Sequence, residues 1–249
     1  MRTSNPALND KVFQARSTSA TDRMTISGTV NKSFLLIGIV FLTAIWSWQQ
    51  AFPGGWSIGV TPTIPVWYLP SAIIGFILGI VIVFKPTASP ILVPIYAALE
   101  GIILGAVSAL FEAKYPGVVM QAVLGTMGTF IALLTAYRSQ LIRATENFKL
   151  GVVAATGGIA LVYLMEIVLR MFGINMPFIN DSGPMGIMVS IVIVVIAALN
   201  LVLDFDFIEK GAEHGAPKYM EWYASFGLLV TLIWLYLEIL RLLAKTRKR

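Results

Sequence analysis

The chain has 249 residues, of which 57% are hydrophobic, 12% are charged and none is cysteine. An ordinary soluble domain has about 25% charged residues, so this composition excludes one and indicates a chain that lies almost wholly in the lipid bilayer. The lack of cysteine excludes disulfides and thiolate chemistry. The formal net charge is +5, but the basic residues gather at the ends of apolar runs, so we interpret them as determinants of membrane topology rather than as a nucleic-acid-binding surface.

Seven apolar runs can be marked along the chain, each long enough to cross a hydrocarbon core of about 30 Å as a helix. We therefore predict an all-α, polytopic membrane protein with seven transmembrane helices. A polar leader at residues 1–32, without the features of a cleaved signal peptide, is expected to be flexible. It precedes a transmembrane domain at 33–245 and a basic tail at 246–249. The runs lie roughly at 33–51, 67–84, 90–112, 118–137, 150–172, 185–208 and 222–244.

The distribution of Lys and Arg favours a leader on the cytoplasmic side, with eleven basic residues on that side of a seven-span topology and seven on the other. The two ends of the chain conflict, however, because residues 1–32 carry five basic residues and residues 241–249 also carry five. Two alternatives stay open: either the tail lies outside despite its charge, or one run does not fully cross the membrane.

Acidic residues within the runs are the main functional signal, since each costs about 2.5–3.5 kcal/mol in a bilayer even on the lenient insertion scale. Two of them have local explanations. Glu166 lies four residues before Arg170, the spacing of an ion pair on one helix face, so we expect a structural pair. Asp206 lies within a turn of Glu209 and Lys210, and we expect it to be solvated at the membrane interface.

Glu100, Asp204 and Glu238 are the stronger candidates for function. Glu100 lies at least ten residues from the ends of its run and precedes a small-xxx-small pair, Gly101 and Gly105, so we expect it to face another helix. Asp204 is either a bundle-facing carboxylate or part of a capped helix end. Glu238 is alternatively a local partner of Arg241, three residues on. Burial disfavours the charged form of a carboxylate, so protonation, cation binding and proton transfer are the available chemistries.

The inventory of residues argues against an enzyme. The last run has no lysine for a retinal Schiff base before Lys245, near its end, and the one histidine, His214, lies between runs. That histidine cannot serve as the base of an intramembrane serine protease, and a histidine zinc motif needs at least two. The Gly-x-Gly-Asp pattern of membrane aspartyl proteases is missing as well. We predict neither an enzymatic activity nor a bound cofactor.

Residues 199–209 (LNLVLDFDFIE), followed by residues 235–238 (LYLE) in the last run, resemble the Bax inhibitor-1 family, and in particular its bacterial YccA-like branch. The resemblance covers roughly residues 33–245. It implies a bundle of seven helices with the last one central, in the plasma (inner) membrane of a bacterium. It also implies a pH-sensitive calcium leak channel gated by two carboxylates, which match Asp204 and Glu238.

By the same resemblance Lys85 is the nearest match to a basic latch at the end of the second helix. Glu100 departs from the family pattern, which more often has an uncharged residue at that place, and we expect it to be an additional acidic residue of the pathway. Calcium, the permeant ion, would be bound transiently by Asp204 and Glu238, since it accepts six to eight oxygen ligands in irregular geometry. The alternative from another class is a regulator whose leader binds a membrane protease such as FtsH, as YccA-like members do.

Chain geometry raises one question about this pair of acids. If the chain turns near Gly215, Asp204 lies about 16 Å from this turn along its helix and Glu238 lies about 35 Å from it along the next helix, at about 1.5 Å per residue. Simple antiparallel helices would not bring the two together. Either residues 216–225 fold back along the interface, or the two carboxylates are not in direct contact.

Overall fold

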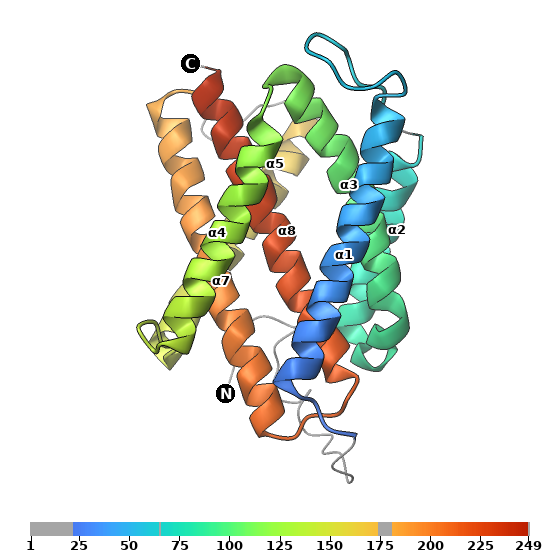
Figure 1. Ribbon diagram of the computed structural model, residues 1–249. Coiled ribbons are helices and arrows are strands. Elements are labelled where there is room, and N and C mark those ends of the chain that lie inside the picture. The colour runs from blue at the N-terminus through green and yellow to red at the C-terminus, as the bar shows by residue number, and fades with distance from the viewer. Residues whose placement is uncertain (1–21, 65, 174–180, 249) are drawn as a thin grey trace. The chain divides into compact units, whose positions relative to one another are not determined.

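The computed structural model describes residues 22–64, 66–173 and 181–248, and each predicted run is the apolar part of one helix in it (Figure 1). Six of these helices are long and apolar enough to cross a membrane, and α2 is shorter, with 17 residues. The helices are α1 (Ile26–Ala51), α2 (Tyr68–Phe84), α3 (Ser89–Lys114), α4 (Val118–Arg138), α5 (Glu146–Met171), α7 (Pro184–Glu213) and α8 (Met220–Arg247), with a 3₁₀ turn, η4 (Pro86–Ala88), before α3.

Most of the helices extend beyond the apolar runs that predicted them, because a helix continues into the polar interface where hydrophobicity stops marking it. The clearest case is α1, which begins at Ile26 rather than near residue 33. Its start is set by Thr25, whose hydroxyl accepts a hydrogen bond from the Gly28 N–H at 3.0 Å. Residues 26–32 of the predicted leader are therefore helical, whereas residues 1–21 of it lie outside the described residues.

The described residues form two compact units. The first holds residues 22–64, 66–119 and 206–230, and the second holds residues 120–173, 181–205 and 231–248. Helices α4, α7 and α8 each contribute residues to both. Of the six long apolar helices, α8 is the most buried: 50% of its apolar stretch is buried inside the protein, compared with 11% for α5.

In the first unit, α1 and α3 pack side by side and run in the same direction (Figure 1). Gly101 of α3 faces Val40 of α1, and further along both helices Ala109 packs on Ala51 and Phe52. The Ser47 hydroxyl also donates to the Ile102 carbonyl at 2.7 Å. A parallel pair requires the chain to return between its members, and α2 makes that return.

The direction of α2 is seen in its contacts with α3. Gly75 of α2 lies against Leu99 and Ile103, whereas Gly79, one turn later, lies against Tyr96. The contacts on α3 therefore move backwards as α2 moves forwards, which makes the two helices antiparallel.

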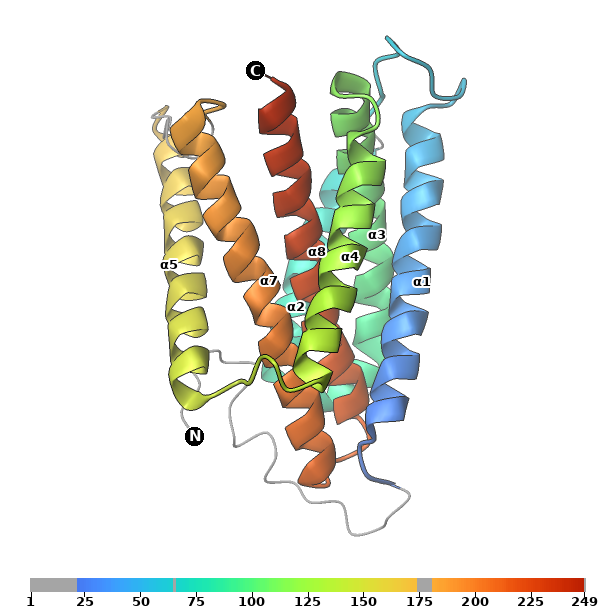
Figure 2. The ribbon, with the colours of Figure 1, turned by 60° about the vertical axis from the view of Figure 1, so that its left-hand side comes forward.

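In the second unit, α7 is joined to α5 and to the end of α8 by polar contacts. The Asn200 amide of α7 donates to the Thr156 hydroxyl of α5 at 2.8 Å, and the two helices lie side by side in Figure 2. The Lys245 ammonium of α8 donates to the Gly186 carbonyl at 3.1 Å and to the Ser190 hydroxyl at 2.7 Å. These bonds satisfy groups that lipid could not.

Gly101→Ala tests the close approach of α1 and α3. A Cβ at this position would meet the Thr43 hydroxyl and the Val40 backbone, so we expect a loss of about 1–3 kcal/mol of stability from overpacking. Gly128→Ala in α4 is the matched control, because nothing lies within 4 Å of its added Cβ and alanine favours the helix by up to about 1 kcal/mol. Unfolding in mixed detergent micelles measures both, and equal effects would contradict the close approach.

Candidate functional site

Asp204 lies on α7 with 8% of its surface exposed. Its side chain is hydrogen-bonded to Thr231 of α8, whereas its Oδ2 atom has no hydrogen-bond partner among the described residues. A buried acceptor without a donor costs free energy comparable to a lost hydrogen bond. This carboxylate therefore has unused capacity to hold a proton or a cation.

Glu238 lies on α8 with 2% of its surface exposed. Both of its carboxylate oxygens accept hydrogen bonds. The Tyr163 hydroxyl of α5 donates to its Oε1 atom at 2.7 Å. The Arg241 guanidinium donates to the two carboxylate oxygens at 3.0 and 3.2 Å and to the Tyr163 hydroxyl at 2.6 Å. It also lies over the Tyr163 ring, 5.2 Å from the centroid. The local pair with Arg241 is thus present, and α5 completes it.

Asp204 and Glu238 have different partners, at different levels of α8. The partner of Asp204, Thr231, lies seven residues before Glu238 on the helix, which corresponds to about 10 Å. No long segment folds back to close this gap, because α8 already begins at Met220. The structure therefore agrees with the second alternative, in which the two carboxylates are not in direct contact.

Glu100 and Lys85 both lie in the first unit, whereas Asp204 and Glu238 lie in the second. Glu100 is half-buried on α3, is hydrogen-bonded to the Tyr96 side chain, and lies opposite Gly75 of α2. Lys85 follows the last residue of α2, is exposed, and forms no ion pair with any residue in the described part of the chain. Its assignment as a latch stays a prediction.

The two acids with local explanations are paired within their own helices. Glu166 pairs with Arg170 at 3.0 Å on α5, and Asp206 pairs with Lys210 at 3.0 Å on α7. The Asp206 side chain is only 15% exposed, so it is less solvated than expected. Among the described residues, no group of three or more His, Asp or Glu side chains is arranged to hold a metal ion.

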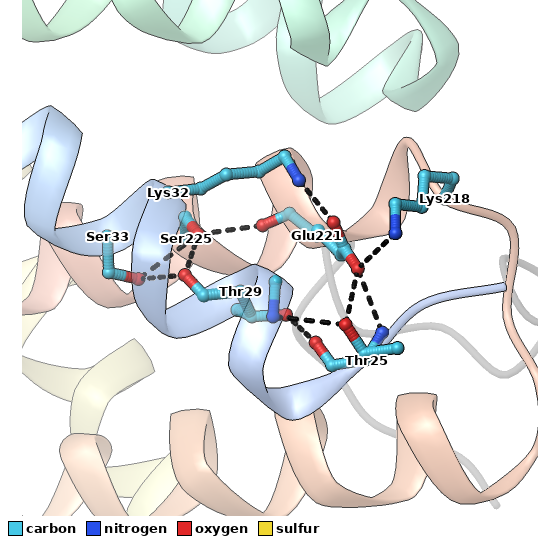
Figure 3. A network of polar contacts seen from close by, with 8 residues as sticks. Thr25, Thr29, Lys32, Ser33, Lys218, Glu221 and Ser225 are labelled. Atoms are coloured by element: carbon cyan, nitrogen blue, oxygen red, sulfur yellow. Dashed lines mark hydrogen bonds and ion pairs between the residues drawn. The ribbon is translucent and has the colours of Figure 1, made fainter. Parts of the chain in front are cut away.

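Another acid, Glu221, is bound by three residues and was missed by sequence reasoning (Figure 3). It lies in the first turn of α8 with none of its surface exposed. Its Oε1 atom accepts from the Thr25 N–H and hydroxyl, both at 2.9 Å, and faces the Lys218 ammonium at 3.4 Å. Its Oε2 atom is bound by Lys32 of α1. One carboxylate therefore joins the beginnings of two helices that are far apart in the sequence.

A second layer of hydroxyl groups continues this contact along the same two helices. Ser225, one turn after Glu221, hydrogen-bonds to the Thr29 carbonyl at 3.0 Å and to the Ser33 hydroxyl at 3.1 Å. Because later residues of α1 meet later residues of α8, these two helices also run in the same direction. A signal for the site existed in the acid at the start of an otherwise apolar run, but its partner Lys32, 189 residues away, could not be read from one sequence.

Removing Arg241 tests whether it compensates the buried Glu238 charge. Arg241→Gln should cost about 3 kcal/mol of stability, near the lower limit for breaking a buried pair, because the Arg241 side chain is 38% exposed. The double variant Glu238→Gln/Arg241→Gln should be more stable than Arg241→Gln alone, since no charge is then left uncompensated. Unfolding in mixed micelles gives the comparison, and additive losses would contradict the pairing.

Six helices in the described part of the chain are long and apolar enough to cross a membrane, which indicates an integral membrane protein. A family model described as Bax inhibitor 1 like matches residues 5–248, which is nearly the whole chain. Searches of curated proteins and of solved structures found no match. On the family match, the chain belongs to the Bax inhibitor 1 like family.

Proposed function

We propose that the protein is a pH-sensitive leak pathway for calcium, with Asp204 as the carboxylate that a passing cation meets. The observation that carries the proposal is the buried Asp204 carboxylate, which has a partner in Thr231 but an Oδ2 atom without one among the described residues. Membership of the family supports the same function. The resemblance of residues 199–209 and 235–238 to that family implies such a channel.

The contrast with Glu238 supports a division of roles. The charge of Glu238 is compensated by Arg241 and Tyr163, so this acid keeps α5 and α8 together in the closed state. No cation in the described part of the chain is paired with Asp204, and its charged form is costly unless one arrives. Its two oxygens and the Thr231 hydroxyl are fewer than the six to eight that calcium accepts, so water completes the shell. Brief binding of this kind suits conduction rather than storage.

The proposal includes seven crossings, with α2 as a full span and α8 at the centre. Support comes from the first unit, where α1 and α3 are parallel and α2 returns between them. Thr25 and Glu221 are also in contact, so the beginnings of α1 and α8 share one face of the membrane. An even number of crossings must separate them, as α1, α2, α3, α4, α5 and α7 provide.

The bacterial plasma membrane and the YccA-like branch belong to the proposal as well. The alternative function is regulation of a membrane protease through the leader. One observation favours it: Asp22 and Met24, just before α1, are hydrogen-bonded to the turn before α8, so the described end of the leader has a fixed position. Under this alternative, deleting residues 1–21, which keeps Asp22–Thr25 in place, should abolish regulation and spare any ion flux, whereas neutralising Asp204 should do the reverse.

Calcium entry into dye-loaded liposomes tests the leak across about pH 6 to 8. We expect a pH-dependent leak that Asp204→Asn reduces by at least about tenfold, a difference of about 1.4 kcal/mol in barrier height. Asp206→Asn is the matched control, because this neighbouring carboxylate is already paired with Lys210 and its loss should leave the leak within about twofold. If calcium does not enter at any pH, or both variants behave alike, the role of Asp204 is refuted.

Labelling of single cysteines tests the topology, since the natural chain has none. Seven crossings place the leader and the tail on opposite sides, so an impermeant maleimide added outside sealed right-side-out vesicles should label only one of Thr18→Cys and Lys248→Cys. Both should react after the vesicles are opened with detergent. Labelling of both, or of neither, in sealed vesicles would mean that one of the helices does not cross.

A further inference from the structure

The four residues before α1, Asp22–Thr25, lie along the turn that connects α7 to α8. The Met24 N–H donates to the Ala216 carbonyl at 2.7 Å, and the Lys218 N–H donates to the Asp22 carbonyl at 2.9 Å. These two bonds place Arg23 opposite Pro217 in a short antiparallel bridge. The Met24 side chain is 2% exposed and so anchors the segment by burial.

Glu221 closes the far end of this segment. Its carboxylate accepts both the N–H and the hydroxyl of Thr25 and is bound by the ammonium groups of Lys32 and Lys218 (Figure 3). A carboxylate with no exposed surface is tolerated because these donors and cations compensate its charge. The same contact determines the start of α1, because the Thr25 hydroxyl accepts the Gly28 N–H as a helix cap.

The close fit extends to the helix backbone. A Cβ on Gly28 would overlap the Glu221 carboxylate, so a larger residue at this position would displace the carboxylate from its contacts. The segment, the cap and the ion pairs therefore form one contact, and separating any part of it from α8 uncovers a buried carboxylate.

We propose that Asp22–Thr25 is a strap locked by Glu221, through which the N-terminal leader controls the position of the start of α8. The strap continues directly from residues 1–21, and α8 is the helix that carries Glu238. Release of the strap from Glu221 frees the first turns of α8. This inference does not depend on calcium conduction, because closure of the strap is measured on the protein itself.

Limited trypsin digestion in nanodiscs, which leave both faces open, measures closure of the strap. The closed strap protects the bond after Arg23, since the next N–H is bonded to Ala216. Cleavage after Arg143, in the exposed α4–α5 connection, is the internal reference. Relative to it, Thr25→Ala and Lys32→Met should accelerate cleavage after Arg23 by roughly tenfold. Thr25→Ser, which keeps the hydroxyl, should match the natural protein.

Maleimide labelling of Ala224→Cys then measures the position of α8. Ala224 lies in the turn after Glu221 and is 3% exposed. The introduced cysteine should therefore react slowly with the maleimide while the strap is closed, and roughly tenfold faster in the Thr25→Ala background. Ser89→Cys is the control, because Ser89 is fully buried at the start of α3 and its hydroxyl has no hydrogen-bond partner among the described residues to lose. Its labelling should not change.

Two results would overturn the proposal. Faster cleavage after Arg23 with unchanged labelling of Ala224→Cys would show that the strap opens without moving α8. Equal acceleration at Ala224→Cys and Ser89→Cys, or at both trypsin sites, would show general unfolding rather than release of a strap.

Discussion

A charged carboxylate withdrawn from water must be compensated by cations or hydrogen-bond donors, and much of the polar structure of this protein follows from that requirement. Glu221 is compensated by two lysines and a helix cap, and Glu238 by one arginine and one tyrosine. Asp204 has a threonine and one oxygen without a partner among the described residues. The first two acids hold helices together, whereas the third keeps capacity for a ligand, which is why the proposed function rests on it.

Close backbone packing is the second constraint, and it decides how the first unit is connected. Gly101 and Gly105 bring α3 against the α1 backbone, because helices in lipid associate through van der Waals contact between small residues rather than through the hydrophobic effect. The resulting pair is parallel, so the short helix α2 has to return between its members. The Thr25–Glu221 contact makes α8 parallel to α1 in the same unit.

Pairs within one helix could be predicted from the sequence, and pairs between helices could not. The Glu166–Arg170 pair and the Glu238–Arg241 contact follow from spacings of four and three residues, which fix neighbours on a helix surface whatever the rest of the chain does. Tyr163 at Glu238 and Thr231 at Asp204 depend on which helix faces come together. Glu221 was missed for the same reason, although an acid at the start of an apolar helix was visible.

The sequence by itself determined that the chain is a helical membrane protein, and it located all seven described α-helices, because a span of lipid demands a long apolar run with its backbone bonded internally. It also located Gly101 and Gly105 as a site of close packing. Only the tertiary structure decided that α1 is parallel to α3 and α8, that Asp204 and Glu238 are bound at different levels of α8, and that Glu221 joins two helix beginnings. These facts depend on contacts between residues far apart in the chain, where spacing along the sequence places no limit on distance.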